Sequence, residues 1–298
     1  MLSRLLGIRI FDVEVSSACN LRCRFCPRDE MKDIGMMTEE TFSRFLETVP
    51  LKATDNVAFV GMGEPTLNPL LPSFVSRLKE RHPGVTTWVT TNGTTLRTDT
   101  MRDLIDAGLD ILDVSFNGLD RESYEDTMRG AKFSPTAAAI EDLAARLERD
   151  RVRTTLQINY VISDENRHRE REIRAFWRSR GVRHFRVQRI HNRAGLVDVP
   201  GMASHRAGLR GKGCGVFGIV NFITWRGDVL YCCHDVRREL TFGNIHNEEW
   251  GVIAARKKQV QKYRKWPSMC ERCTDPLRFD MRRTVDRKII SHLMGVGS

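Results

Sequence analysis

The segment Cys19-Asn20-Leu21-Arg22-Cys23-Arg24-Phe25-Cys26-Pro27 decides how the rest of the chain is interpreted. Its three thiols are spaced C-x3-C-x2-C and follow an apolar run, Ile8–Val15, that predicts a strand. Three protein ligands are one fewer than a tetrahedral zinc site or a fully ligated cubane cluster requires. A metal centre held by three ligands keeps a position open for a substrate. The segment therefore predicts a reactive metal site.

This pattern resembles the radical S-adenosylmethionine (radical SAM) superfamily, in which an aromatic residue, here Phe25, directly precedes the last cysteine. The resemblance implies that Cys19, Cys23 and Cys26 hold three irons of a 4Fe–4S cluster and that SAM chelates the fourth iron. A zinc knuckle or buried free cysteines are the alternatives. They fit less well, because zinc sites favour paired C-x2-C spacing with four ligands.

Further motifs resemble the SAM-binding segments of the same superfamily. Gly61-Met62-Gly63-Glu64-Pro65 follows a predicted strand and matches the "GGE" motif, with Met62 in place of the first glycine of the adjacent pair. That motif implies contacts to the SAM amino group, and Ser115-Phe116-Asn117-Gly118 resembles a segment beside the SAM ribose. The residues assigned to the cofactor are Phe25, Gly63, Glu64, Asn92, Ser115 and Asn159.

Strand and helix patterns alternate six times in the first two hundred residues. The expected strands are Ile8–Val15, Val57–Val60, Val85–Thr90, Ile111–Phe116, Thr155–Ile162 and His184–Ile190. Expected helices begin at Thr38 and span Pro69–Arg81 and Asn166–Ser179. Repeated right-handed βα units imply a parallel sheet that curls toward a barrel. We therefore predict an α/β fold, a partial (β/α)6 TIM barrel over residues 1–200, with its site at the carboxyl ends of the strands.

A second cysteine cluster follows a glycine-rich stretch at residue 201. Its spacing is Cys214-x12-Gly227-x4-Cys232, and a C-x2-C pair follows at Cys270 and Cys273. Apolar runs on both sides of Gly227 predict a β-hairpin with glycine in the turn. Four thiols make a closed site, which on these residues alone suits a zinc ribbon as well as an iron–sulfur cluster.

The second module resembles the SPASM and twitch domains that follow radical SAM barrels. No cysteine follows Cys273, so the match is to the shorter twitch form. The resemblance implies one auxiliary 4Fe–4S cluster bound by Cys214, Cys232, Cys270 and Cys273. We assign residues 201–275 to this twitch/SPASM-like domain and residues 276–298 to a basic tail.

Cys233 is the one cysteine not assigned to iron. Strand alternation predicts that it points to the face opposite Cys232. It is either a small buried residue of the core or a catalytic hydrogen-atom donor, because radical SAM epimerases use a cysteine to quench the substrate radical.

Composition and charge limit the partners. The chain has 298 residues, 41% of them hydrophobic, and a net charge of +10. No apolar run reaches membrane-spanning length and the cysteine loop comes too early for a signal peptide, so a cytoplasmic location without membrane contact is expected. The basic surface suggests a solvated helix face or a docking surface for an acidic flavodoxin or ferredoxin, in preference to nucleic acid.

The resemblance implies a radical SAM enzyme with two 4Fe–4S clusters and SAM as cofactors. It is similar to the dehydrogenases and epimerases of aminoglycoside biosynthesis, which suggests hydrogen abstraction from a carbinol C–H of a sugar or aminocyclitol. A peptide-modifying enzyme and a zinc-binding nucleic-acid module are the alternatives. Further candidates for substrate contacts are Gln188, Arg189, His191, Arg193, His234 and Asp235.

Overall fold

The computed structural model describes residues 9–198 and 214–275 of the chain. Within these residues, the first part forms a curved sheet whose six neighbouring strands all pair in parallel. The strands are β1 (Ile10–Val13), β2 (Asn56–Phe59), β3 (Thr86–Thr91), β4 (Ile111–Ser115), β5 (Thr155–Ile162) and β6 (His184–Arg189). The predicted partial (β/α)6 barrel is confirmed.

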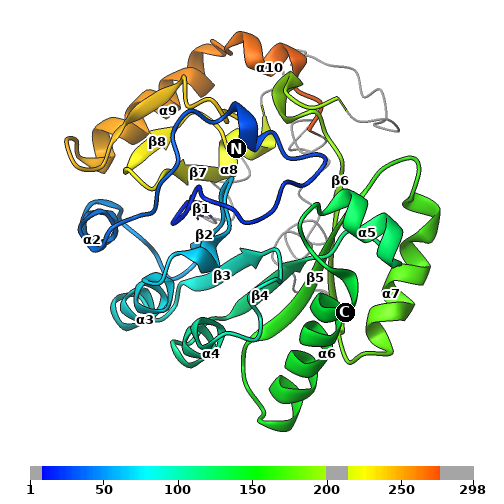
Figure 1. Ribbon diagram of the computed structural model, residues 1–298. Helices are drawn as coiled ribbons and strands as arrows, with labels where there is room; N and C mark the ends of the chain where they lie inside the picture. The colour runs from blue at the N-terminus through cyan, green and yellow to red at the C-terminus, as the bar shows by residue number, and fades with distance from the viewer. Residues whose placement is uncertain (1–8, 199–213, 276–298) are drawn as a thin grey trace.

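Helices cover the outer side of this sheet, as Figure 1 shows. They are α2 (Glu39–Thr48), α3 (Leu71–Arg81), α4 (Asp99–Asp106), α6 (Phe133–Arg149) and α7 (Glu170–Arg178), with the short α5 (Arg121–Thr127) near the carboxyl ends of the strands. Thr38 caps α2 as predicted, because its hydroxyl accepts a hydrogen bond from the Thr41 amide at 3.2 Å. Phe11 and Val13 are fully buried under the helices. Alternation along β1 therefore turns Ile10 and Asp12 toward the barrel lumen.

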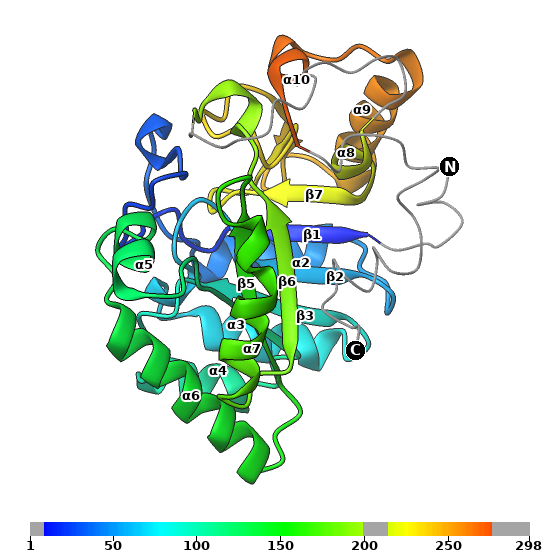
Figure 2. The ribbon, with the colours of Figure 1, turned by 90° about the vertical axis from the view of Figure 1, so that its right-hand side faces the viewer.

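The second module continues the barrel sheet. It consists of α8 (Gly215–Ile219), β7 (Val220–Ile223), β8 (Asp228–Leu230), β9 (Thr241–Asn244), α9 (Trp250–Tyr263) and α10 (Ser268–Arg272). The predicted hairpin is confirmed: β7 and β8 are antiparallel, and Gly227 has a φ of +84° in the turn. Strand β7 pairs in parallel with β1, and Figure 2 shows them side by side. The described residues thus form one sheet in the order β6-β5-β4-β3-β2-β1-β7-β8-β9.

The module also contacts the other edge of the barrel, beyond β6. The Asn192 side-chain amide donates to the Arg272 carbonyl at 2.7 Å, and the Asn192 and Thr274 residues exchange two further hydrogen bonds of 2.9 and 3.0 Å. The open side of the barrel therefore faces the second thiol cluster. The predicted boundary at residues 200–201 and the predicted tail at 276–298 lie outside the described residues. Among the helices that the structure describes, none is long and apolar enough to cross a membrane.

Candidate active site

The first thiol cluster lies in a loop that is closed on itself directly after β1. The Arg28 guanidinium donates to the carbonyls of Cys19 and Leu21, both at 2.7 Å, and the Cys26 amide donates to the Cys23 carbonyl at 3.0 Å. Burial raises the pKa of Cys23 to about 12, and the neighbouring sulfurs of Cys26 and Cys19 add to this effect. The three thiols therefore converge, and a bound cation such as iron is what would stabilise them as thiolates.

Gly63 brings the second motif against this loop. The Glu64 amide donates to the Ala18 carbonyl at 2.7 Å, one residue before Cys19. A Cβ added to Gly63 would lie 2.4 Å from the Ser16 carbonyl oxygen and 2.5 Å from that of Ala18. Only glycine permits this approach of backbone to backbone. The motif's glycine thus fixes the position of the loop that carries the cysteines.

We expect Gly63→Ala to destabilise the protein by about 1–3 kcal/mol, because a methyl group at this position displaces backbone and not a flexible side chain. The matched control is Gly251→Ala in α9, where an added Cβ meets nothing within 4 Å. That control should be neutral or stabilising by up to about 1 kcal/mol. Urea unfolding of both variants checks the prediction. Equal free energies of unfolding for the two would contradict it.

The Glu64 carboxylate links the second motif to the end of β3. It accepts hydrogen bonds from the hydroxyls of Thr66 and Thr91 and from the Asn92 amide, each at 2.7 Å. Burial raises the pKa of Glu64, while these hydrogen bonds lower it. Asn92 in turn donates to the Asn20 side chain in the cysteine loop at 2.8 Å. In this geometry Glu64 positions Asn92 beside the thiols. The predicted contact between Glu64 and SAM stays a prediction.

A cavity opens beside the cysteine loop at the carboxyl ends of β4, β5 and β6. Phe25, Asn117, Val161 and Ile190 are among its lining residues. The Asn117 side chain accepts a hydrogen bond from the Val161 amide at 2.7 Å, so the predicted ribose segment and β5 are joined there. This combination of apolar and polar groups suits a nucleoside. Val161 and Ile190 were not predicted from the sequence as residues of this cavity, although their positions at the ends of strands could have indicated that role.

Polar side chains fill the lumen below this cavity. The Asp113 carboxylate accepts hydrogen bonds from the Gln157 amide at 2.7 Å, from the Asn159 amide at 3.1 Å and from the Arg186 guanidinium at 3.1 Å. Arg186 also lies over the Trp88 ring, 4.5 Å from its centroid. The register places Ser115, which is partly buried, opposite Asn159. The predicted residues Ser115 and Asn159 are thus brought together, with Asp113 as an unpredicted anchor.

The second thiol cluster surrounds its own cavity. Cys214, Cys232, Cys270 and Cys273 all line it, together with apolar residues that include Phe217, Tyr231 and Trp266. Burial raises the pKa of Cys214 to about 12, and the charges of Asp275, Cys273 and Cys270 act in the same direction. Residues distant in sequence thus supply four soft sulfur donors to one enclosed space, which fits a fully ligated iron–sulfur cluster.

Cys233 does not lie where strand alternation predicts. Its sulfur is within 4.8 Å of the Cys232 sulfur and of a His234 ring nitrogen, so the two cysteines do not point to opposite faces. The reason is that β8 ends at Leu230, before the pair, and the chain then turns. Asp12 of β1 is among the groups that act electrostatically on Cys233, which places this thiol toward the barrel.

The remaining candidates fall into two groups. His191 and His234 meet at the seam beyond β6, where His234 hydrogen-bonds Asp275 at 2.7 Å and the two imidazole rings are 4.6 Å apart. Arg193 adds positive charge there and lowers the pKa of His191, although burial is the larger cause. The others are structural or peripheral: Asp235 accepts two backbone hydrogen bonds, Gln188 lies beside Arg186, and Arg189 is exposed.

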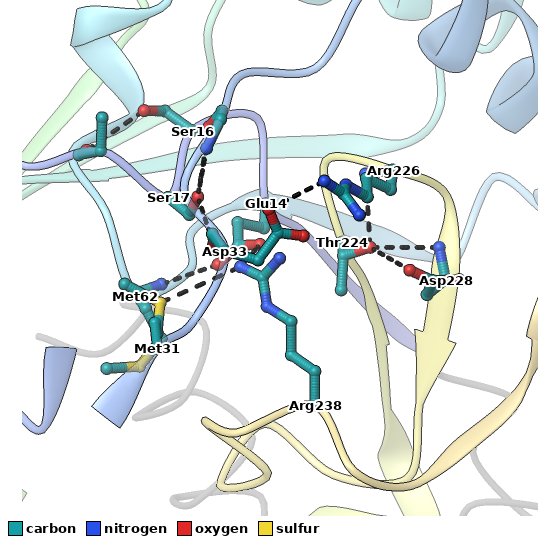
Figure 3. A network of polar contacts seen from close by, with 12 residues as sticks. Glu14, Ser16, Ser17, Met31, Asp33, Met62, Thr224, Arg226, Asp228 and Arg238 are labelled. Atoms are coloured by element: carbon teal, nitrogen blue, oxygen red, sulfur yellow. Dashed lines mark hydrogen bonds and ion pairs between the residues drawn. The ribbon is translucent and has the colours of Figure 1, made fainter. Parts of the chain in front are cut away.

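Ion pairs hold the second module against the segments that flank the cysteine loop. Arg238 donates to the Glu14 carboxylate at 2.8 Å, and Figure 3 shows its side chain reaching from the module to β1. Glu14 is 1% exposed and also accepts a hydrogen bond from the Met62 amide. Arg226 pairs with Asp33 at 2.8 Å nearby. Sequence reasoning missed this clamp, because its partners are more than 190 residues apart.

Two family models match the chain. One describes the radical SAM superfamily and matches residues 13–176, and the other describes an iron–sulfur cluster-binding domain, SPASM, and matches residues 214–274. The first covers more than half of the chain, and together they span both thiol clusters.

Curated relatives match over part of their length. A GTP 3′,8-cyclase of Chlorobaculum tepidum is 32% identical over 157 residues, which are 51% of this chain and 46% of that protein. A tungsten-containing aldehyde ferredoxin oxidoreductase cofactor-modifying protein of Pyrococcus furiosus is 27% identical over 57% of this chain and 48% of that protein. The chain therefore spans about half the length of these relatives.

Solved structures share the fold over most of the chain. BtrN in complex with AdoMet and 2-DOIA has a TM-score of 0.62 and 20% identity, covering 90% of this chain and 94% of that one. The anSMEcpe structure with bound AdoMet has a TM-score of 0.64 and 16% identity, covering 92% of each chain. At these identities the likeness shows the common architecture of a barrel with an attached second module.

Proposed function

Because this chain belongs to the radical SAM superfamily, we propose that it abstracts a hydrogen atom from a carbinol C–H of a sugar or aminocyclitol and then oxidises or epimerises that carbon. Its cofactors are SAM and 4Fe–4S clusters, including an auxiliary one. Bound together, they supply the 5′-deoxyadenosyl radical. The electron donor in this proposal is an acidic flavodoxin or ferredoxin, which the net charge of +10 favours.

The thiols divide between the two clusters according to the segment of the fold that carries them. Cys19, Cys23 and Cys26 hold the cluster that binds SAM, with the cavity beside Phe25 for the nucleoside part. Cys214, Cys232, Cys270 and Cys273 hold the auxiliary cluster. The chain's residues shape and enclose the space between these two sites and so exclude water from a radical reaction.

The polar side chains of the barrel lumen are the observation that supports a hydroxylated substrate. The side-chain carbonyl oxygens of Gln157 and Asn159 are buried and have no hydrogen-bond partner among the described residues. A buried acceptor without a donor is unfavourable by about 1–3 kcal/mol. Both oxygens are closed off by neighbouring side chains, so a ligand reaches them only when those side chains move. The polar groups of Asp113, Gln157, Asn159 and Arg186 favour a hydroxylated ring over an apolar substrate in this region.

Cys233→Ala separates epimerisation from oxidation. If the thiol delivers hydrogen to the substrate radical, the wild-type product formed in D₂O should be an epimer that carries deuterium at the inverted carbon, and the variant should form ketone or no epimer. Mass spectrometry and NMR of the product provide the measurement. Cys233→Ser is the matched control, because it keeps the size but replaces the weak S–H bond with a strong O–H bond.

An unchanged product from Cys233→Ala would remove the donor role of this thiol. Hydrogen transfer to 5′-deoxyadenosine from a peptide, with none from any carbinol, would instead support a peptide-modifying enzyme. Iron content of both variants should equal that of the wild type, which excludes damage to the auxiliary cluster as the cause.

A further inference from the structure

Strand β1 presents one unusual side chain to the lumen. Ile10, Asp12 and Glu14 alternate with buried core residues and share the inner face. The register places Asp12 opposite Ala58, which is in turn opposite Trp88. Ala58 and Trp88 form a small apolar cluster with Ile111, and Ile10 and Val60 pack against it. Asp12 therefore points into the same interior space as Trp88 and Arg186.

Asp12 differs from the neighbouring acidic side chains Glu14 and Asp113, because it has no hydrogen-bond or ion-pair partner within the part of the chain that the structure describes. Glu14 is paired with Arg238, and Asp113 is bound by Gln157, Asn159 and Arg186. Among residues 9–198 and 214–275, no hydrogen bond or ion pair reaches the Asp12 carboxylate. Burial raises the pKa of Asp12 to about 7, yet the residue keeps exposed surface. Asp12 is therefore a partly exposed acidic residue on the inner face of β1.

Several cationic groups already surround Asp12. Arg186, Lys257, His234 and Arg193 all act on it electrostatically. These groups direct their hydrogen atoms elsewhere: Arg186 donates to Asp113 at 3.1 Å, Lys257 to the Asn221 side chain at 3.0 Å, and His234 contacts Asp275. A further cation beside Asp12 would meet repulsion from them. An uncharged O–H donor would satisfy the carboxylate without adding charge.

We propose that Asp12 is a substrate-binding residue, and that it accepts a hydrogen bond from an uncharged hydroxyl group of a cyclic polyol held in the lumen. The proposal rests on the proposed function and narrows its substrate class, because it favours a neutral sugar or cyclitol over an amine-bearing one. Cys233 lies near the same carboxylate, so a ring anchored on Asp12 would present its carbons to that thiol.

The test is binding of neutral cyclic polyols to the anaerobically reconstituted enzyme with SAM, measured by calorimetry. The probes are myo-inositol, scyllo-inositol and glucose, each compared with its analogue in which one hydroxyl is replaced by an amine. We expect the wild type to bind at least one neutral probe about 10-fold more tightly than its amine analogue. Asp12→Ala should weaken that binding about 10-fold or more, the range for a hydrogen bond to a charged group, and Asp12→Asn should fall between.

Asp142→Asn is the control for loss of a carboxylate, since Asp142 lies exposed on α6 and pairs with Arg97. Its affinities should equal those of the wild type. The inference is overturned if amine analogues bind as tightly as neutral probes, if no neutral probe binds, or if the isosteric Asp12→Asn variant, folded and with full iron content, binds like the wild type.

A separate measurement keeps the proposed function distinct. Deuterium at the carbinol carbon of a bound probe should appear in 5′-deoxyadenosine. Binding that depends on Asp12 without deuterium transfer would retain the inference and reject carbinol chemistry. Transfer that is unaffected by Asp12→Asn would retain the chemistry and reject the role of Asp12.

Discussion

Replacing Cys23 by alanine should abolish formation of 5′-deoxyadenosine and reduce the iron content from about eight to about four atoms per chain. The three thiols of the cysteine loop converge on one space, and two thiolates cannot replace three as ligands of a cluster that must also leave one iron for SAM. Anaerobic reconstitution, followed by iron and sulfide analysis and chromatography of the SAM cleavage products, measures both quantities.

Cys214→Ala provides the matched control for this prediction, because it removes one thiol from the other cavity. Its iron content should also fall to about four atoms per chain, whereas reductive SAM cleavage without substrate should persist. Retention of full iron by Cys23→Ala, or of SAM cleavage, would show that the C-x3-C-x2-C loop does not hold the reactive cluster. Zinc in place of iron in the wild type would reject both assignments.

Arg238→Ala should lower the free energy of unfolding by about 3–5 kcal/mol at neutral pH, the range for removing one partner of a buried ion pair. Glu14 is 1% exposed, so its carboxylate would lose its charged partner without gaining water. Burial raises the pKa of Glu14 even with Arg238 present. Both proteins share the same unfolded state, so the loss should be small while Glu14 is protonated in both folded proteins and should grow as pH rises through the raised folded-state pKa of Glu14.

Arg226→Ala is the control, because Arg226 and Asp33 form a more exposed pair that joins the module to the segment after the cysteine loop. It should change stability by less than about 1 kcal/mol. Urea unfolding at pH 5 and pH 8 compares the two variants. Similar losses for both, or a loss for Arg238→Ala that does not grow with pH, would mean that the Glu14 pair does not hold the module in place.

The local motifs were predictable because each carries its own geometric signature. The cysteine loop, the glycine of the second motif and the hairpin turn at Gly227 depend on residues close in sequence. Thr38 likewise caps its helix through an amide three residues away. Such features follow from backbone sterics and residue spacing, so they can be predicted without knowledge of what packs against them.

The predicted orientation of the Cys233 side chain was wrong, because it depends on where a strand ends. Alternation holds only while a strand continues, and the end of β8 at Leu230 depends on pairing with β9, which ends at that position with a register shift. The strand that pairs with β8 is β9, which comes from a later part of the sequence. A pattern of apolar residues alone does not reveal where pairing stops.

By itself, then, the sequence determined the superfamily, the alternating βα order and the two groups of thiols, because these depend on spacing along the chain. The tertiary structure decided which side chains meet in the lumen. The pairing of β7 with β1 brings the second module to the barrel, and Arg238 of that module pairs with Glu14. Those contacts join residues more than 200 positions apart, and their energies depend on burial and charge that exist only once the sheet has formed.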